Sequence, residues 1–94
     1  MEFLVEFQVQ VPVGTPEAAI DERETAEAAA AAQLASEGHL VRLWRAPGEN
    51  TVVGLYQADS ETALARLLAA LPLHDWMHVD VRPLAAHPND PARP

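Results

Sequence analysis

Histidine, aspartate and arginine side chains gather in residues 71–88, near the end of this chain. Three of the four histidines lie there, and a histidine ring gains and loses a proton near neutral pH. Residues 76–82 alternate as a strand does, with Met77, Val79 and Val81 on one side. The other side then carries Trp76, His78, Asp80 and Arg82. We expect this polar side to bind a ligand or to be covered by a second subunit.

A metal site in this stretch is the less favoured interpretation. His74 and His78 have the spacing of ligands on a helix, whereas the residues around them predict a strand. We therefore predict no metal. His39 and His78 are instead candidate acid–base groups, because histidine titrates near neutral pH.

The composition narrows the chemistry and the partners. The 94 residues include 14 acidic side chains and six arginines, with no lysine and no cysteine, for a formal net charge of −8. An acidic surface argues against binding to nucleic acids or anionic membranes. The missing lysine excludes Schiff-base chemistry, and the missing cysteine excludes a thiolate nucleophile. No apolar run approaches the ~20 residues of a membrane span. Because the chain also has no cysteine, we expect a cytoplasmic protein, and we expect its partner to be a small molecule.

The hydrophobic pattern predicts the elements that position these side chains. Alternation predicts strands over residues 2–11, 39–46, 51–57 and 76–82. Helix-forming residues predict helices over about 17–37 and 61–71, the first capped by Thr15 and the second by Ser60. Gly54, inside a strand, indicates a bulge or the close approach of another group.

This order of elements predicts an α+β, ferredoxin-like β-α-β-β-α-β subunit. Its four-stranded antiparallel sheet has both helices on one face. We expect residues 1–88 to form this single domain and residues 89–94, which are rich in proline, to form a tail. The second face of the sheet needs a cover, so we expect the sheets of two subunits to pair in a homo-oligomer.

A set of residues along nearly the whole chain is specific when taken together. It comprises Phe3, Val5, Val9, Pro12-Val13, Glu27, Glu37-Gly38, Leu43-Trp44-Arg45, Gly48, Leu71-Pro72-Leu73, Met77, Val81, Leu84 and His87-Pro88. This set resembles the muconolactone delta-isomerase family. The resemblance implies dimers that assemble into a decameric ring. It also implies a cofactor-free proton shift that converts muconolactone to the 3-oxoadipate enol-lactone in aromatic catabolism.

The chain departs from this family in places. An acid pair followed by lysine in the first helix of the family is Ala26-Glu27-Ala28 here, and its tyrosine and asparagine on the third strand become Thr51-Val52-Val53-Gly54. His39, His74, Trp76 and His78 are also particular to this chain. We therefore expect this chain to share the fold of the family more closely than its exact substrate.

The reaction implied by the resemblance needs a base that shuttles a proton. It also needs a donor for the developing oxyanion and a cation for the substrate carboxylate. Glu27, in mid-helix among alanines, is the first candidate base, and His39 and His78 are its rivals. A solvated glutamate on an acidic helix is the alternative interpretation of Glu27.

Arginine and tryptophan side chains are the candidate substrate-binding groups. Arg45 is the first candidate for the carboxylate, because a guanidinium can bind a carboxylate through two bonds. Its alternative role is a salt bridge between subunits. Arg42, on the opposite face of the strand, is the reserve, and Trp44 and Trp76 are candidate pocket walls.

Two other functions stay open at this point. One is a cyclase or cofactorless monooxygenase of a biosynthetic pathway on the same fold. The other is a non-catalytic ligand-binding or assembly protein. An enclosed pocket beside Glu27 would favour an enzyme. A solvent-exposed Glu27, with Arg45 paired to another subunit, would count against this choice of site residues.

Overall fold

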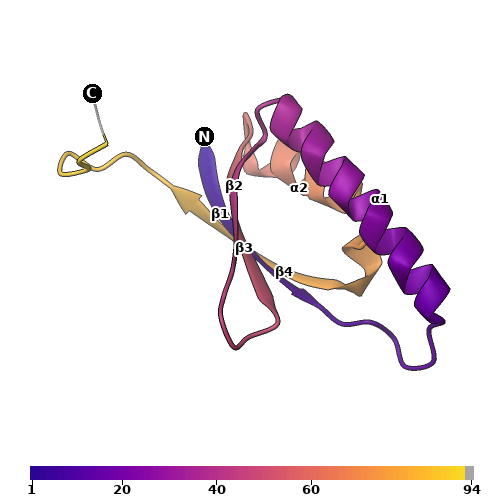
Figure 1. Cartoon of the computed structure of the whole chain (residues 1–94). Helices are drawn as coiled ribbons and strands as arrows, with labels where there is room; N and C mark the ends of the chain where they lie inside the picture. The colour runs from indigo at the N-terminus through magenta and orange to yellow at the C-terminus, as the bar shows by residue number, and fades with distance from the viewer. Residues whose placement is uncertain (93–94) are drawn as a thin grey trace.

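The structure, a computed structural model, describes residues 1–92, which follow the predicted β-α-β-β-α-β order. The elements are β1 (Glu2–Val9), α1 (Glu17–Ser36), β2 (Leu40–Arg45), β3 (Thr51–Gln57), α2 (Glu61–Ala69), a short 3₁₀ helix η1 (His74–Trp76) and β4 (Met77–Leu84). The strands pair antiparallel in the order β2-β3-β1-β4. Within the described residues, both α-helices lie on one side of this sheet, and the other side carries none (Figure 1). The predicted ferredoxin-like α+β fold is confirmed.

The core lies between the sheet and its helices. Phe3, Val5 and Phe7, at alternate positions of β1, are buried against Leu64 and Leu68 of α2. Burying side chains of this size contributes about 1.5–3 kcal/mol each. The long helix α1 adds one buried residue, Leu34, because alanine fills most of its sheet-facing positions.

The chain enters β4 through a turn that the sequence pattern did not predict. Trp76 belongs to η1, where its backbone N–H donates to the Leu73 carbonyl oxygen over 2.9 Å. The strand itself starts at Met77 and continues to Leu84. The prediction that Trp76 shares a strand face with His78 is therefore wrong, since an i→i+3 hydrogen bond turns the backbone before the strand begins.

Strand β2 contains one extra residue. Leu40 is opposite Tyr56, whereas Arg42 is opposite Leu55, so Val41 forms a bulge. The bulge resets the alternation, leaving Leu40 on the helix side while Arg42 faces the other side. This resetting decides which arginine can reach the space under α1.

The ends of the helices and strands differ in part from prediction. Thr15 does not cap α1; its hydroxyl donates to the Pro12 carbonyl oxygen over 2.7 Å, and the first strand ends at Val9. Ser60 does cap α2, accepting the Ala63 N–H over 3.0 Å. Gly38, with a φ of 83°, ends α1, and the last helical residue, Ser36, is close to the predicted residue 37.

The segment after β4 projects away from the body of the molecule (Figure 1). The chain turns at Pro88 and Asn89, where His87 Nδ1 accepts the Asn89 N–H over 3.0 Å. The last two residues of the predicted tail 89–94 lie outside the described residues. No helix in residues 1–92 is both long and apolar enough to cross a membrane.

Candidate active site

A cavity of about 300 Å³ lies between α1 and the sheet. Ala28 and Ala31 line its helix side, and their small side chains leave this space unfilled. The complete lining is Phe7, Val9, Glu24, Glu27, Ala28, Ala31, Leu43, Val52, Tyr56, Leu73 and Met77. A mostly apolar wall with a few polar groups is typical of a small-molecule site.

Glu27 is the half-buried carboxylate of this cavity. Its Oε1 accepts the backbone N–H of Leu73 over 3.0 Å. Leu73 lies between α2 and η1, so this bond joins α1 to the chain segment that leads into β4. The bond orients the carboxylate at the cavity wall. Glu24 lines the same wall one helical turn earlier.

Tyr56, which was not among the residues predicted for the site, is the second polar group of the cavity that matters chemically. Its side chain is 3% exposed, and its ring meets that of Phe7 edge-on, with centroids 6.0 Å apart. Burial, and secondarily the Glu27 carboxylate, raises the pKa of Tyr56 to about 12. The phenol therefore keeps its proton near neutral pH and can donate it in a hydrogen bond. Its alternation with Val52 and Gly54 along β3 was the signal that could have revealed it.

Gly54 has no side chain, and the Tyr56 ring occupies the space that a side chain there would need. A Cβ at this position would lie 2.5 Å from Cε1 of Tyr56 and 3.3 Å from Cδ1 of Leu43. The predicted close approach at Gly54 is thus confirmed.

Replacing Gly54 with alanine should therefore displace the Tyr56 ring. We expect the free energy of unfolding to fall by about 1–3 kcal/mol, the usual cost of overpacking a core. Urea denaturation measures it, with Tyr56→Ala and the double variant completing a cycle. In the Tyr56→Ala background the same change should cost much less. An equal cost in both backgrounds would show that the ring is not what the new methyl group meets.

Arg45 lies on the cavity side of the sheet, at the rim. It is opposite Val52 and two residues beyond Leu43, and both of those residues line the cavity. The side chain itself is exposed. A guanidinium here can receive the carboxylate of a ligand whose apolar part enters the cavity.

The structure does not bring the other predicted arginine, tryptophans and histidines into this lining. Strand alternation sends Arg42 and Trp44 to the helix-free face, where the Arg42 Cζ lies 5.0 Å from the Trp44 ring centroid. His78 is on that face too, 65% exposed, with Nε2 3.5 Å from the Asp80 carboxylate. His39 lies past the end of α1, with Nδ1 2.9 Å from the Gln57 carbonyl oxygen. Trp76 lies outside the lining, where its ring contacts the guanidinium of Arg23 on α1.

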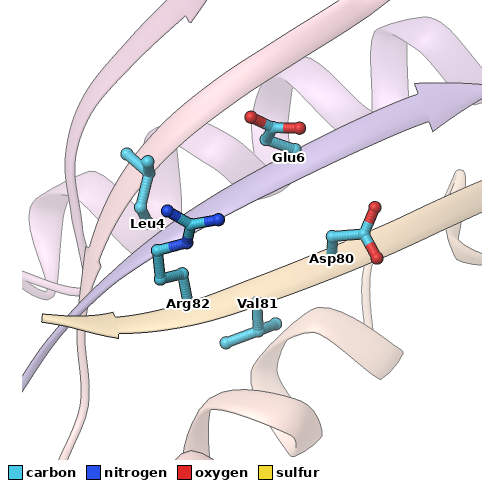
Figure 2. Close-up of a pocket in the computed structure, with 5 residues that line it drawn as sticks. All are labelled: Leu4, Glu6, Asp80, Val81 and Arg82. Carbon is cyan, nitrogen blue, oxygen red and sulfur yellow. The ribbon is translucent and has the colours of Figure 1, made fainter.

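A second hollow, of about 400 Å³, lies over β1 and β4 and is lined by Leu4, Glu6, Asp80, Val81 and Arg82. Figure 2 shows Glu6, Asp80 and Arg82 on the same side of the sheet, with Arg82 reaching from β4 toward β1 and Val81 pointing the other way. Glu6 and Asp80 are opposite each other in the β1–β4 pairing. Among residues 1–92, no three His, Cys, Asp or Glu side chains come close enough to hold a metal ion.

Comparison with known proteins identifies relatives of the whole chain. The family model of muconolactone delta-isomerase matches residues 1–90. A muconolactone delta-isomerase of Cupriavidus pinatubonensis is 37% identical over 89 residues, which are 95% of this chain and 97% of that protein. Muconolactone delta-isomerase 1 of Acinetobacter lwoffii is 32% identical, over 95% of this chain and 93% of that protein.

Solved structures show the same relationship. A crystal structure of muconolactone isomerase superposes with a TM-score of 0.91 at 30% identity, covering 100% of this chain and 98% of that one. SnoaB, a cofactor-independent oxygenase from Streptomyces nogalater, superposes with a TM-score of 0.52 at 20% identity, covering 96% and 95%. The second likeness extends to the fold alone.

Proposed function

Since this chain belongs to the muconolactone delta-isomerase family and is an isomerase of that kind, we propose that its substrate is muconolactone or a closely related small unsaturated lactone. The observation that carries this proposal is the apolar cavity under α1 with Glu27 and Tyr56 in its wall. The reaction needs no cofactor, because a carboxylate can both remove and return the proton. The likeness to an oxygenase reaches only the fold, so it lends no support to oxygenase or cyclase chemistry.

The proposed mechanism starts at the acidic carbon next to the ring oxygen of the lactone. The Glu27 carboxylate takes the proton from this carbon, and the electron pair spreads over the ring toward its carbonyl oxygen. The protonated Glu27 then returns the same proton at the other end of the delocalised system. The double bond moves, and no atom or electron is gained or lost. Because the Leu73 N–H holds Oε1, the second oxygen of Glu27 is available for the transfer.

Tyr56 is the proposed donor to the negative charge that develops on the ring carbonyl oxygen. A phenol that stays protonated well above neutral pH keeps its hydrogen bond to that oxygen throughout the cycle. Arg45 is the proposed partner of the carboxylate of the substrate. It provides a local positive charge at the rim of a chain whose formal net charge is −8.

An ultraviolet assay of the purified protein with muconolactone tests the proposal directly. We expect conversion to the 3-oxoadipate enol-lactone without added metal or cofactor. If the protein converted a related lactone but not muconolactone, the proposed substrate would be wrong and the proposed reaction class would stand. Failure with every unsaturated lactone tried would overturn the proposed chemistry.

We also propose that two subunits pair through the helix-free face of the sheet. Trp44 is 43% exposed there and Leu84 is 38% exposed, which favours burial against a partner. The charges of this face nearly balance, with Glu2, Glu6 and Asp80 against Arg42 and Arg82. Two such faces would meet with far less repulsion than the charge of the whole chain suggests. Assembly of the dimers into a decamer is the expectation from the family.

Replacing Trp44 with glutamate should therefore dissociate the pair. Burying an unpaired carboxylate in an apolar interface is costly, so we expect the mass in solution to fall to that of a monomer. Analytical ultracentrifugation measures it and also counts the subunits of the wild-type assembly. Val13→Glu is the matched control, because Val13 is fully exposed in the loop before α1. A monomeric wild type, or an equal effect of both variants, would contradict pairing through this face.

The remaining proposals concern the chain as a whole. We propose that residues 1–88 form the single domain and that residues 89–94 are a tail, which limited proteolysis should remove without unfolding the rest. We propose a cytoplasmic location as well, and cell fractionation tests it.

A further inference from the structure

Arg23, which precedes the candidate base Glu27 on α1 by four residues, contacts the loop between α2 and β4. Its Nη1 donates to the Pro72 carbonyl oxygen over 3.3 Å. Its Cζ also lies 4.4 Å from the centroid of the Trp76 ring, within the range of a cation–π contact. Arg23 is half-buried and does not line the cavity, so its contacts are with this loop.

The peptide group that Arg23 binds is the same one that binds Glu27. The Pro72 carbonyl oxygen and the Leu73 N–H belong to a single planar unit, and a trans peptide directs the two in opposite directions. Arg23 and Glu27 are four residues apart on α1, so they lie one above the other on the same helix face. Arg23 therefore binds the C=O end of this peptide group, and Glu27 binds its N–H end.

This geometry has a physical consequence for the base. A cation at the carbonyl oxygen polarises the peptide, which makes its N–H a stronger donor at the other end. Trp76 restricts the Arg23 guanidinium by stacking on it. The 3₁₀ helix η1 positions Trp76, because it turns the chain directly after the Pro72–Leu73 peptide. Without the cation, the turn that the His74 N–H closes on the Leu71 carbonyl oxygen over 3.0 Å would still hold this peptide. The Leu73 N–H would be a weaker donor, however, and would hold Glu27 less firmly in one orientation.

We propose that Arg23 is a positioning residue of this enzyme, acting on Glu27 through the Pro72–Leu73 peptide, with Trp76 as the platform that fixes its guanidinium. The inference rests on the proposed role of Glu27 as the base. It gives α1 a second functional residue and Trp76 a role other than lining the pocket.

Arg23→Met removes the charge and the donor but keeps an unbranched stem against Trp76. We expect kcat to fall by about 10-fold to 100-fold, the scale of a misplaced catalytic group, with KM changed by less than about 2-fold because Arg23 does not line the cavity. Arg23→Lys restores a cation and a donor, and should recover part of kcat. Arg66→Met is the matched control, since Arg66 is an exposed arginine on α2. It should leave both constants unchanged.

A readout that needs no substrate follows the peptide itself. In proton–nitrogen spectra of the folded protein, the Leu73 amide should exchange with solvent faster and shift upfield in Arg23→Met. A wild-type Leu73 signal in Arg23→Met, or wild-type kcat in that variant while Glu27→Gln is inactive, would overturn the inference alone. Full turnover by Glu27→Gln would instead overturn the proposed base, and the role of Arg23 with it. A loss of kcat that Arg23→Lys does not relieve at all would reduce Arg23 to a packing role.

Discussion

Replacing Glu27 with glutamine should lower kcat for the lactone by about 10²-fold to 10⁴-fold, the usual contribution of a general base. Glutamine has nearly the shape of glutamate, and its amide oxygen can still accept the Leu73 N–H that Glu27 accepts in the structure over 3.0 Å. It cannot take up the proton. The cavity and its apolar wall remain, so KM should change little. Steady-state kinetics in the ultraviolet assay measure both constants.

Glu24→Gln is the matched control for this variant. Glu24 lines the same cavity from the same helix, one turn earlier, and the chemical change is identical. We expect it to keep most of the activity. If Glu24→Gln were the inactive variant, Glu24 would be the base. If both variants stayed active, neither carboxylate of this cavity would be the base, and the proposed site would be overturned.

Replacing Tyr56 with phenylalanine should lower kcat by about 10²-fold to 10³-fold, the range observed when one oxyanion donor is removed. Phenylalanine keeps the ring that packs edge-on against Phe7, so the loss should come from the hydroxyl group. The free energy of unfolding near neutral pH should change by about 1 kcal/mol or less. An active Tyr56→Phe variant would contradict the role of Tyr56 as the donor.

The same residue predicts a pH dependence of stability. The pKa of Tyr56 is about 12 in the folded protein, against 10.0 for an unburied tyrosine, so the folded state holds this proton more tightly. The stabilisation is fully present below pH 10.0 and is lost as the pH rises toward about 12. It amounts to about 2–3 kcal/mol for a shift of this size in a buried group.

Alkaline unfolding and phenolate absorbance measure this dependence cleanly, because Tyr56 is the single tyrosine of the chain. Tyr56→Phe should lose less stability between pH 10.0 and about 12 than the wild type does. A phenol that titrates at its ordinary pKa in the folded protein would show that Tyr56 is neither desolvated nor influenced by Glu27.

Much of the scaffold could be predicted from local patterns. Alternation along residues 2–9 decides that Phe3, Val5 and Phe7 enter the core, because strand side chains point to opposite faces. Ser60 caps α2 because its hydroxyl group accepts a backbone N–H of the first turn that has no partner within the helix. The order of the elements then leaves few ways to build the sheet, and the fold follows.

The local departures from prediction arise where contacts distant in sequence outweigh the local pattern. Trp76 fits the alternation of a strand, yet it lies in η1, where it stacks on Arg23 of α1. The bulge at Val41 is invisible to a pattern with a period of two, because it depends on the pairing of β2 with β3. Thr15 satisfies the signal of a cap, but its hydroxyl group turns back to Pro12.

The sequence by itself therefore determined the α+β fold with its two α-helices and four strands, because their patterns depend on neighbours within a few residues. Glu27 became a candidate base through its place in mid-helix among alanines together with the resemblance to the family. Only the tertiary structure decided which groups surround that carboxylate. The Leu73 N–H reaches Glu27 from the loop before η1, and Tyr56 of β3 lines the same cavity, both across long sequence separations. The same packing placed His78, Arg42 and Trp44 on the opposite face. The sequence contains no local signal for these contacts. They depend on how α1 lies across the sheet and on the space that its small alanine side chains leave between helix and sheet.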